Sequence, residues 1–224
     1  PPEKNIAFKA AQSFFAEAGL GGGIRIAISK KVPAGGGLGG GSSNAAAVLR
    51  GMNMLFGHPL PFPSLYRLGL GLGADVPFFL RGGTWLMKGR GDVFAREIRC
   101  RPLRFLLFML GHHSDTKTVF GQYRAPEAYA APSASGVLAA LRTGRAALAR
   151  ASMRNDLLSP FLSSYPGQER IYMDLRERMC KNLFLSGSGA TFFSVFDTTS
   201  QAREAFLRLD EKLRPCAVHA RSIF

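Results

Sequence analysis

The chain has 224 residues, of which 46% are hydrophobic and 20% are charged. This apolar content is enough for a buried core, which excludes a wholly disordered or collagen-like chain. Twenty-nine Lys and Arg residues against fifteen Asp and Glu residues give a net charge of +14, so we expect an anionic partner. Charge alone leaves open nucleic acid, a membrane surface and a phosphorylated small molecule.

The three cysteines are widely separated, at Cys100, Cys180 and Cys216. An odd number without a Cys-x-x-Cys pair argues against a zinc site and a secreted disulfide framework, and it predicts a cytoplasmic protein. The longest apolar stretch, Leu103 to Leu110, is too short to cross a bilayer and contains Arg104. It predicts a buried strand, and we expect no transmembrane segment.

The first part of the chain predicts a helix, a strand, a glycine loop and a second helix. Apolar residues at Ile6, Ala10 and Phe14 share one helical face, and Gly19 is a typical C-terminal stop. Residues 24–28 alternate as in a strand. After a run with six glycines in seven positions, residues 42–44 (Ser-Ser-Asn) predict the cap of an alanine-rich helix that reaches about residue 53.

Helices and strands intermingle in the remainder without steady β-α alternation, which favours the α+β class. Ser64 is expected to cap a helix, and the soft domain boundary near residue 90 predicts domains 1–90 and 91–224. The other predicted elements are strands near 84–87 and 103–110, a helix near Thr118, a polar loop at 125–136, helices near 137–150 and 168–180, two strands within 184–196, and a helix over 200–213.

The glycine run predicts a phosphate-binding loop. Glycine lets backbone N–H groups approach an anion closely, and the positive end of the following helix adds favourable charge. A flexible linker is the simpler alternative, but linkers do not usually lie between a strand and a capped helix. The dinucleotide fingerprint lacks its later acid, and no Gly-Lys-Ser/Thr sequence ends the loop as in Walker A.

Asp75 is the candidate catalytic base. No Asp or Glu lies between Glu17 and Asp75, so it is the first carboxylate after a basic stretch suited to a polyanionic nucleotide. Phosphoryl transfer to a hydroxyl often uses a carboxylate to accept the hydroxyl proton. A helix-capping or turn aspartate is an equally good interpretation from spacing alone.

A second glycine-rich segment, Ser-Gly-Ser-Gly at 186–189, lies between apolar segments. By itself it is most simply a tight turn. Together with the first loop, it could close over the same ligand. The pair His112-His113 has no acidic or cysteine cluster near it in sequence, so we expect no metal site there.

The two glycine-rich segments and the segment around Asp75 resemble three motifs of the GHMP kinase superfamily, in the family's order along the chain. Within the superfamily they are most similar to the 4-diphosphocytidyl-2-C-methyl-D-erythritol kinases. Residues 33–46 (PAGGGLGGGSSNAA) resemble the phosphate-loop motif, 73–79 (GADVPFF) the catalytic-aspartate segment, and 185–190 (LSGSGA) the third motif. Residues 89–92 and 154–157 are also similar. The likeness extends over essentially the whole chain.

The resemblance implies a two-domain GHMP-kinase fold with an incomplete N-terminal domain. It also implies ATP-dependent phosphorylation, with magnesium, of the 2-hydroxyl of a cytidine-diphosphate alcohol in isoprenoid precursor synthesis, with Asp75 as base. The implied ATP phosphate-binding residues are Pro33, Gly35, Gly36, Gly37, Leu38, Gly39, Gly40, Gly41, Ser42 and Ser43. The implied substrate-binding residues are Lys30, Phe120, Ser186, Gly187, Ser188 and Gly189.

The sequence departs from the family pattern at its beginning. The family's Pro-Ala-Lys-Leu-Asn strand, whose lysine partners the catalytic aspartate, and its Gly-Tyr-His segment do not occur in these residues. By alignment, Pro1 falls well inside the family's N-terminal domain, so we expect either a fragment or a protein that has lost part of its active site.

Two other functions stay open at this point. One is a GHMP kinase acting on homoserine, mevalonate or a sugar. The other is a non-catalytic basic homologue that binds nucleic acid, which the scattered basic residues and the lack of an aromatic-basic repeat disfavour. We therefore expect a small-molecule substrate and neither a nucleic-acid nor a membrane partner.

Overall fold

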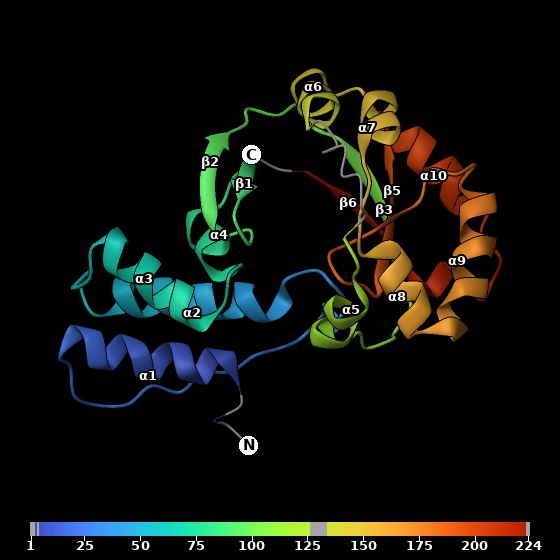
Figure 1. Cartoon of the computed structure of the whole chain (residues 1–224). Helices are drawn as coiled ribbons and strands as arrows, with labels where there is room; N and C mark the ends of the chain where they lie inside the picture. Colours follow the sequence, from blue (N-terminus) through green and yellow to red (C-terminus); the bar gives the residue numbers. More distant parts are fainter. Residues whose placement is uncertain (1–2, 4, 126–133, 223–224) are drawn as a thin grey trace. The chain divides into compact units, whose positions relative to one another are not determined.

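The computed structural model describes residue 3 and residues 5–125 and 134–222, and it divides into two compact units. Unit 1 comprises Pro1–Val32 and Gly39–Glu97, and unit 2 comprises Pro33–Leu38 and Ile98–Phe224 (Figure 1). The glycine run is therefore shared, with residues 33–38 in unit 2 and Gly39 onward in unit 1. The family-domain boundary near residue 90 stays a prediction.

Unit 1 is built on four helices: α1 (Ile6–Ala18), α2 (Gly40–Leu55), α3 (Phe62–Leu72) and α4 (Val76–Arg81). Helix α1 packs along α2 and α3, and α2 packs on α4. Their apolar faces meet in a core that includes Phe14, Leu49 and Val76, each fully buried. The predicted stop of α1 is confirmed, because Gly19 takes the left-handed conformation at φ +63° that favours glycine.

A two-stranded antiparallel hairpin completes unit 1, with β1 (Trp85–Lys88) paired to β2 (Val93–Glu97). Strand β1 was expected, whereas β2 was not, because most of its side chains are exposed and its sequence lacks a clear apolar alternation. The Arg81 guanidinium lies 4.1 Å from the centre of the Trp85 ring, a cation–π contact that joins α4 to the hairpin.

Three predictions in unit 1 are wrong. Residues 24–28 form no strand, because the described strands of this unit pair only with each other and an unpaired segment cannot make a ladder. Helix α2 begins at Gly40, before the expected Ser-Ser-Asn cap, and Gly39 occupies the N-cap. Ser64 lies inside α3 and does not cap it, because the helix begins after Pro61, whose ring pre-sets φ.

Unit 2 has a four-stranded antiparallel sheet in the order β4-β5-β3-β6. Its strands are β3 (Arg104–Met109), β4 (Phe184–Leu185), β5 (Thr191–Phe196) and β6 (Ala217–Arg221). The surrounding helices are α5 (Thr116–Gln122), α6 (Ser135–Thr143), α7 (Ala146–Ser152), α8 (Leu158–Ser164), α9 (Pro166–Arg178) and α10 (Thr199–Leu207), with a short 3-10 turn at Arg214–Cys216. Leu106, Phe108 and Phe192 are fully buried on the central strands.

The α+β class is confirmed, as are the strands near 103–110 and within 184–196 and the helices near Thr118 and 168–180. The region 137–150 holds two helices, because Gly144 adopts a left-handed conformation that ends α6. Helix α10 ends at Leu207 and not at 213, while α8 and β6 were not predicted. Most of the expected polar loop, 126–133, lies outside the described residues.

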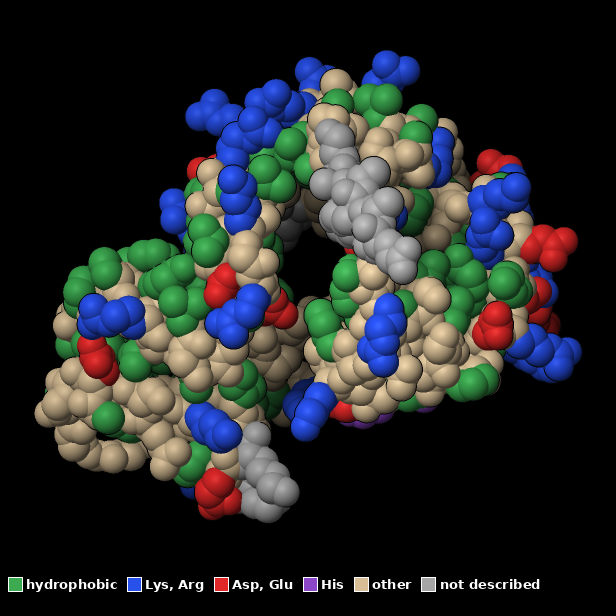
Figure 2. All heavy atoms as spheres, in the orientation of Figure 1, with side chains coloured by type: hydrophobic (Ala, Val, Ile, Leu, Met, Phe, Trp, Pro, Cys, Tyr) green, Lys and Arg blue, Asp and Glu red, His purple; other side chains and the backbone are tan. Residues whose placement is uncertain are grey.

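Among the described residues, no helix is both long and apolar enough to cross a membrane. Lys and Arg side chains are spread over both units in Figure 2, and no single basic run accounts for the charge.

Candidate active site

The first glycine loop, residues 33–43, is fixed in unit 2 through three consecutive carbonyl oxygens. The Ser114 N–H donates to Gly35 O at 3.0 Å, and the Thr191 N–H donates to Gly36 O at 3.1 Å. The Ser186 hydroxyl donates to Gly37 O at 2.9 Å. The direction in which this part of the loop presents its peptide groups is therefore set by three donors outside the loop.

These bonds leave the following amides available. Because a peptide unit is planar and trans, the N–H that follows each bonded carbonyl points to the opposite side. The N–H groups of Gly36, Gly37 and Leu38 make no hydrogen bond within the described part of the chain. Positive φ values at Gly35, Gly37 and Gly39 alternate with ordinary ones, the backbone pattern of an anion-binding nest.

Glycine is required in this loop for space as well as for φ. A Cβ added at Gly35, where φ is +68°, would lie 2.1 Å from the His113 ring. One added at Gly37, where φ is +72°, would lie 2.2 Å from Ser186 O. Substitution at Gly37 would force the loop away from the backbone of the second loop, whereas at Gly35 the exposed His113 ring would have to move.

In unit 1 the same loop continues into the first turn of α2. Gly39 is the N-cap and supplies no side-chain hydrogen bond to the helix, while the Ser43 hydroxyl donates to Gly40 O at 2.9 Å. The orphan N–H groups of this first turn therefore lack a side-chain cap among the described residues. A helix N-terminus of this kind carries partial positive charge and accommodates phosphate.

Asp75 lies at the N-cap position of α4, and its side chain makes no capping hydrogen bond. Its carboxylate is exposed and forms no hydrogen bond or ion pair within the described residues. One turn later, Phe79 packs on Gly39, where an added Cβ would lie 2.6 Å from the ring. Unit 1 thus brings the start of α4 to the start of α2, and this carboxylate has no bonding partner among the described residues.

The second glycine loop, residues 186–189, is a tight turn closed by a hydrogen bond from the Gly189 N–H to Ser186 O at 2.9 Å. The Asn155 side-chain amide donates to Leu185 O at 3.0 Å and to Gly187 O at 2.7 Å. The turn interpretation was therefore correct, and the loop also contacts the first one. Sequence reasoning missed Ser114 and Thr191, which have no recognisable sequence signal.

The predicted substrate residues lie in both units. Phe120 is 56% exposed on α5, so it is not part of the core and its ring is available for stacking. Lys30 is exposed in the irregular segment before the first glycine loop. His113 contacts Ala34 O at 3.2 Å, and the described residues hold no group of three His, Cys, Asp or Glu side chains that could bind a metal.

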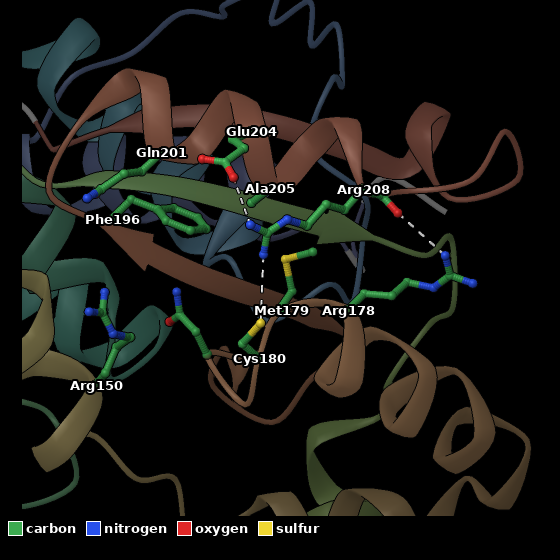
Figure 3. Close-up of a pocket in the computed structure, with 10 residues that line it drawn as sticks. Arg150, Arg178, Met179, Cys180, Phe196, Gln201, Glu204, Ala205 and Arg208 are labelled. Atoms are coloured by element: carbon green, nitrogen blue, oxygen red, sulfur yellow. Dashed lines mark hydrogen bonds and ion pairs between the residues drawn. The ribbon is translucent and has the colours of Figure 1, made fainter.

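A separate cavity of about 390 Å³ in unit 2 is lined by residues of α7, α9, β5 and α10 (Figure 3). Arg178 pairs with Asp174 and Asp210, and Arg208 pairs with Glu204. The hydrogen bond that the Arg178 guanidinium donates to the Asp174 carboxylate raises the pKa of Arg178. Because these two guanidinium groups have acidic partners, and none of the predicted site residues lines the cavity, we do not assign the active site here.

Two family profiles match the chain. The N-terminal domain of GHMP kinases matches residues 5–83, and the C-terminal GHMP kinase region matches residues 137–214. A 4-diphosphocytidyl-2-C-methyl-D-erythritol kinase of Synechococcus sp. (strain JA-3-3Ab) is 36% identical over 211 residues, which cover 90% of this chain and 68% of that protein. The enzyme of the same name from Lachnospira eligens is 33% identical, over 92% of this chain and 72% of its own length.

Solved structures give the same relationship. A crystal structure of 4-(cytidine 5'-diphospho)-2C-methyl-D-erythritol kinase superposes with a TM-score of 0.77 and 30% identity, covering 97% of this chain and 77% of the other. A homoserine kinase from Cytophaga hutchinsonii superposes with a TM-score of 0.75 at 18% identity, covering 99% and 76%. The second likeness shows the fold alone.

Proposed function

This chain belongs to the GHMP kinase family, and we propose that it transfers the terminal phosphate of ATP to the 2-hydroxyl of 4-diphosphocytidyl-2-C-methyl-D-erythritol. It is thus an ATP-dependent small-molecule kinase of the isoprenoid precursor pathway. The single observation that carries the proposal is the geometry of the first glycine loop. Three of its carbonyl oxygens accept hydrogen bonds from the rest of unit 2, and the successive N–H groups that follow them stay available to bind a polyphosphate.

The loop residues and Asp75 have separate roles in the reaction. The N–H groups of residues 36–38 and of the first turn of α2 bind the phosphate oxygens and stabilise the charge of the transition state. Asp75 accepts the proton as the 2-hydroxyl oxygen forms its bond to the terminal phosphorus. The phosphorus–oxygen bond to the leaving diphosphate then breaks, and ADP departs.

The remaining substrate contacts belong to the same proposal. The exposed ring of Phe120 would stack on the cytosine, and the Lys30 ammonium would lie against the cytidine portion. Ser186, Gly187, Ser188 and Gly189 would line the phosphate region through their backbone, since the two serine hydroxyl groups bond to other protein atoms.

Magnesium would be held mainly by the nucleotide's phosphate oxygens, because the described residues hold no group of three acidic, His or Cys side chains that could bind it. When bound, it would neutralise phosphate charge. Within the first glycine loop, the side-chain oxygens that could contact it are the hydroxyl groups of Ser42 and Ser43.

The three cysteines are free thiols, which supports a reducing, cytoplasmic location as part of the proposal.

The test is steady-state ATP turnover with the cytidine substrate, with homoserine, mevalonate and a sugar as alternative acceptors. Asp75→Asn should lower kcat by at least roughly a hundredfold with little change in folding, because its side chain is exposed and unpaired. Glu211→Gln, at another exposed acid, is the matched control and should keep full activity. Phosphorylation of mevalonate but not of the cytidine substrate would reject the proposed acceptor, and near-normal turnover of Asp75→Asn would reject the proposed base.

A further inference from the structure

Ser114 is bonded to both glycine loops of unit 2. It lies between β3 and α5 and is only 3% exposed. Its backbone N–H donates to Gly35 O in the first loop at 3.0 Å, and its hydroxyl donates to Ser188 O in the second loop at 2.7 Å. One residue therefore bonds to both loops, to the first through its backbone and to the second through its side chain.

Both hydroxyl groups of the second loop form hydrogen bonds to other atoms of the protein. The Ser186 hydroxyl donates to Gly37 O at 2.9 Å, and the Ser188 hydroxyl is paired with Thr116 Oγ1 at 2.8 Å. Ser188 is 92% buried by its neighbours, since only 8% of it is exposed. The Ser186 hydroxyl therefore supports the first loop, and the Ser188 hydroxyl ties the second loop to the start of α5. We infer that neither hydroxyl contacts a ligand itself.

We propose that Ser114 is a positioning residue, which holds the second glycine loop against the first so that the amides of residues 36–38 face the nucleotide phosphates. This inference rests on the proposed kinase function. Without the Ser114 hydroxyl, Ser188 O loses its partner in a buried place. The turn that carries Ser186 then keeps the bonds from Asn155 but loses the one that ties it to the segment holding Gly35. The carbonyl of Gly37 is then held less firmly, and the loop samples orientations that do not bind phosphate.

The test compares Ser114→Ala with Ser194→Ala. Ser194 is also fully buried in unit 2, and its hydroxyl donates to the backbone oxygen of Asn182, which is in neither glycine loop. Both substitutions delete one buried hydroxyl hydrogen bond, so both should lower thermal stability by similar amounts. Only Ser114→Ala should weaken nucleotide binding, which calorimetry measures with a nonhydrolysable ATP analogue and magnesium, without any acceptor.

We expect the dissociation constant of the ATP analogue to rise about tenfold in Ser114→Ala, the change that corresponds to one well-placed hydrogen bond. Ser114→Cys, with a weaker donor of similar shape, should give an intermediate value, and it replaces the alanine variant if that variant does not fold. A rise of less than threefold in Ser114→Ala, or an equal rise in Ser194→Ala, overturns the assignment. A wild-type protein that binds the analogue but phosphorylates no acceptor would instead refute the proposed function and leave this comparison valid.

Discussion

Gly37→Ala tests the requirement for close approach in the first glycine loop. The substitution has two costs, which separate control variants resolve. Gly37 has φ +72°, a region that costs an L-residue about 1–2 kcal/mol. Gly111, also in unit 2, has φ +70° with no atom within 4 Å of an added Cβ, so Gly111→Ala measures the cost of φ alone.

The second cost at Gly37 is steric. An added Cβ would lie 2.2 Å from Ser186 O and 2.7 Å from Gly189 O, whereas ordinary contact begins at 3.4 Å. The loop must move by roughly 1 Å, which disrupts the bonds from Ser186 and Thr191, each worth about 1 kcal/mol. This additional loss of about 2 kcal/mol should lower the melting temperature by about 4–8 °C relative to Gly111→Ala.

The assays are thermal unfolding by circular dichroism and binding of an ATP analogue. The only tryptophan of the chain, Trp85, lies in unit 1, so its fluorescence would not report on unit 2 directly. Gly167→Ala, in open space within α9 and without positive φ, should be neutral or slightly stabilising. If Gly37→Ala has the same melting temperature as Gly111→Ala and keeps wild-type affinity for the analogue, the close contact between Gly37 and Ser186 O is wrong.

Two further predictions concern unit 2. Phe120→Ala should raise the KM for the cytidine substrate about tenfold, because stacking on a base is worth about 1–3 kcal/mol. The KM for ATP and the melting temperature should stay unchanged, because the ring is 56% exposed and not part of the core. An equal rise in both KM values would argue against cytosine stacking. Hydrogen bonds from Thr118 lower the pKa of Asp115 below its ordinary value of 3.8, so this carboxylate stabilises the folded protein above that pH, and the contribution is lost as the pH falls through the lowered pKa. Asp115 is the N-cap of α5, and its side chain accepts the Thr118 N–H. Asp115→Asn should therefore make the unfolding midpoint less dependent on pH in that acidic window, and an unchanged pH profile would contradict a stabilising role for this cap.

The sequence was sufficient for those elements whose cause is local. Helix α1 could be predicted because its apolar spacing and the left-handed residue Gly19 act within a few residues of each other. The glycine run and Asp75 could be singled out because each stands out from the local composition of the sequence. A run of six glycines in seven and the first acid after 57 residues without one are visible without any structure.

The sequence was insufficient where the cause lies elsewhere in the chain. Residues 24–28 alternate like a strand, yet a strand also needs a neighbour, and the described residues of unit 1 supply none. Helix α2 has two plausible caps in its sequence, and the left-handed Gly39 moves the start of the helix ahead of both serines. Alternation and capping preference are local signals, so they could not report either effect.

The candidate site combines both kinds of information. Glycine content explains why the loop can adopt alternating positive φ values, but it does not determine which side of the loop its amides face. That direction is set by donors from residues 114, 186 and 191, which are 79, 149 and 155 positions from their acceptors along the chain and become neighbours only in the fold of unit 2. A glycine run without these donors would be a flexible linker. The anion-binding property therefore belongs to the loop together with Ser114, Ser186 and Thr191, and variants that keep all the glycines but lose one donor distinguish the two descriptions.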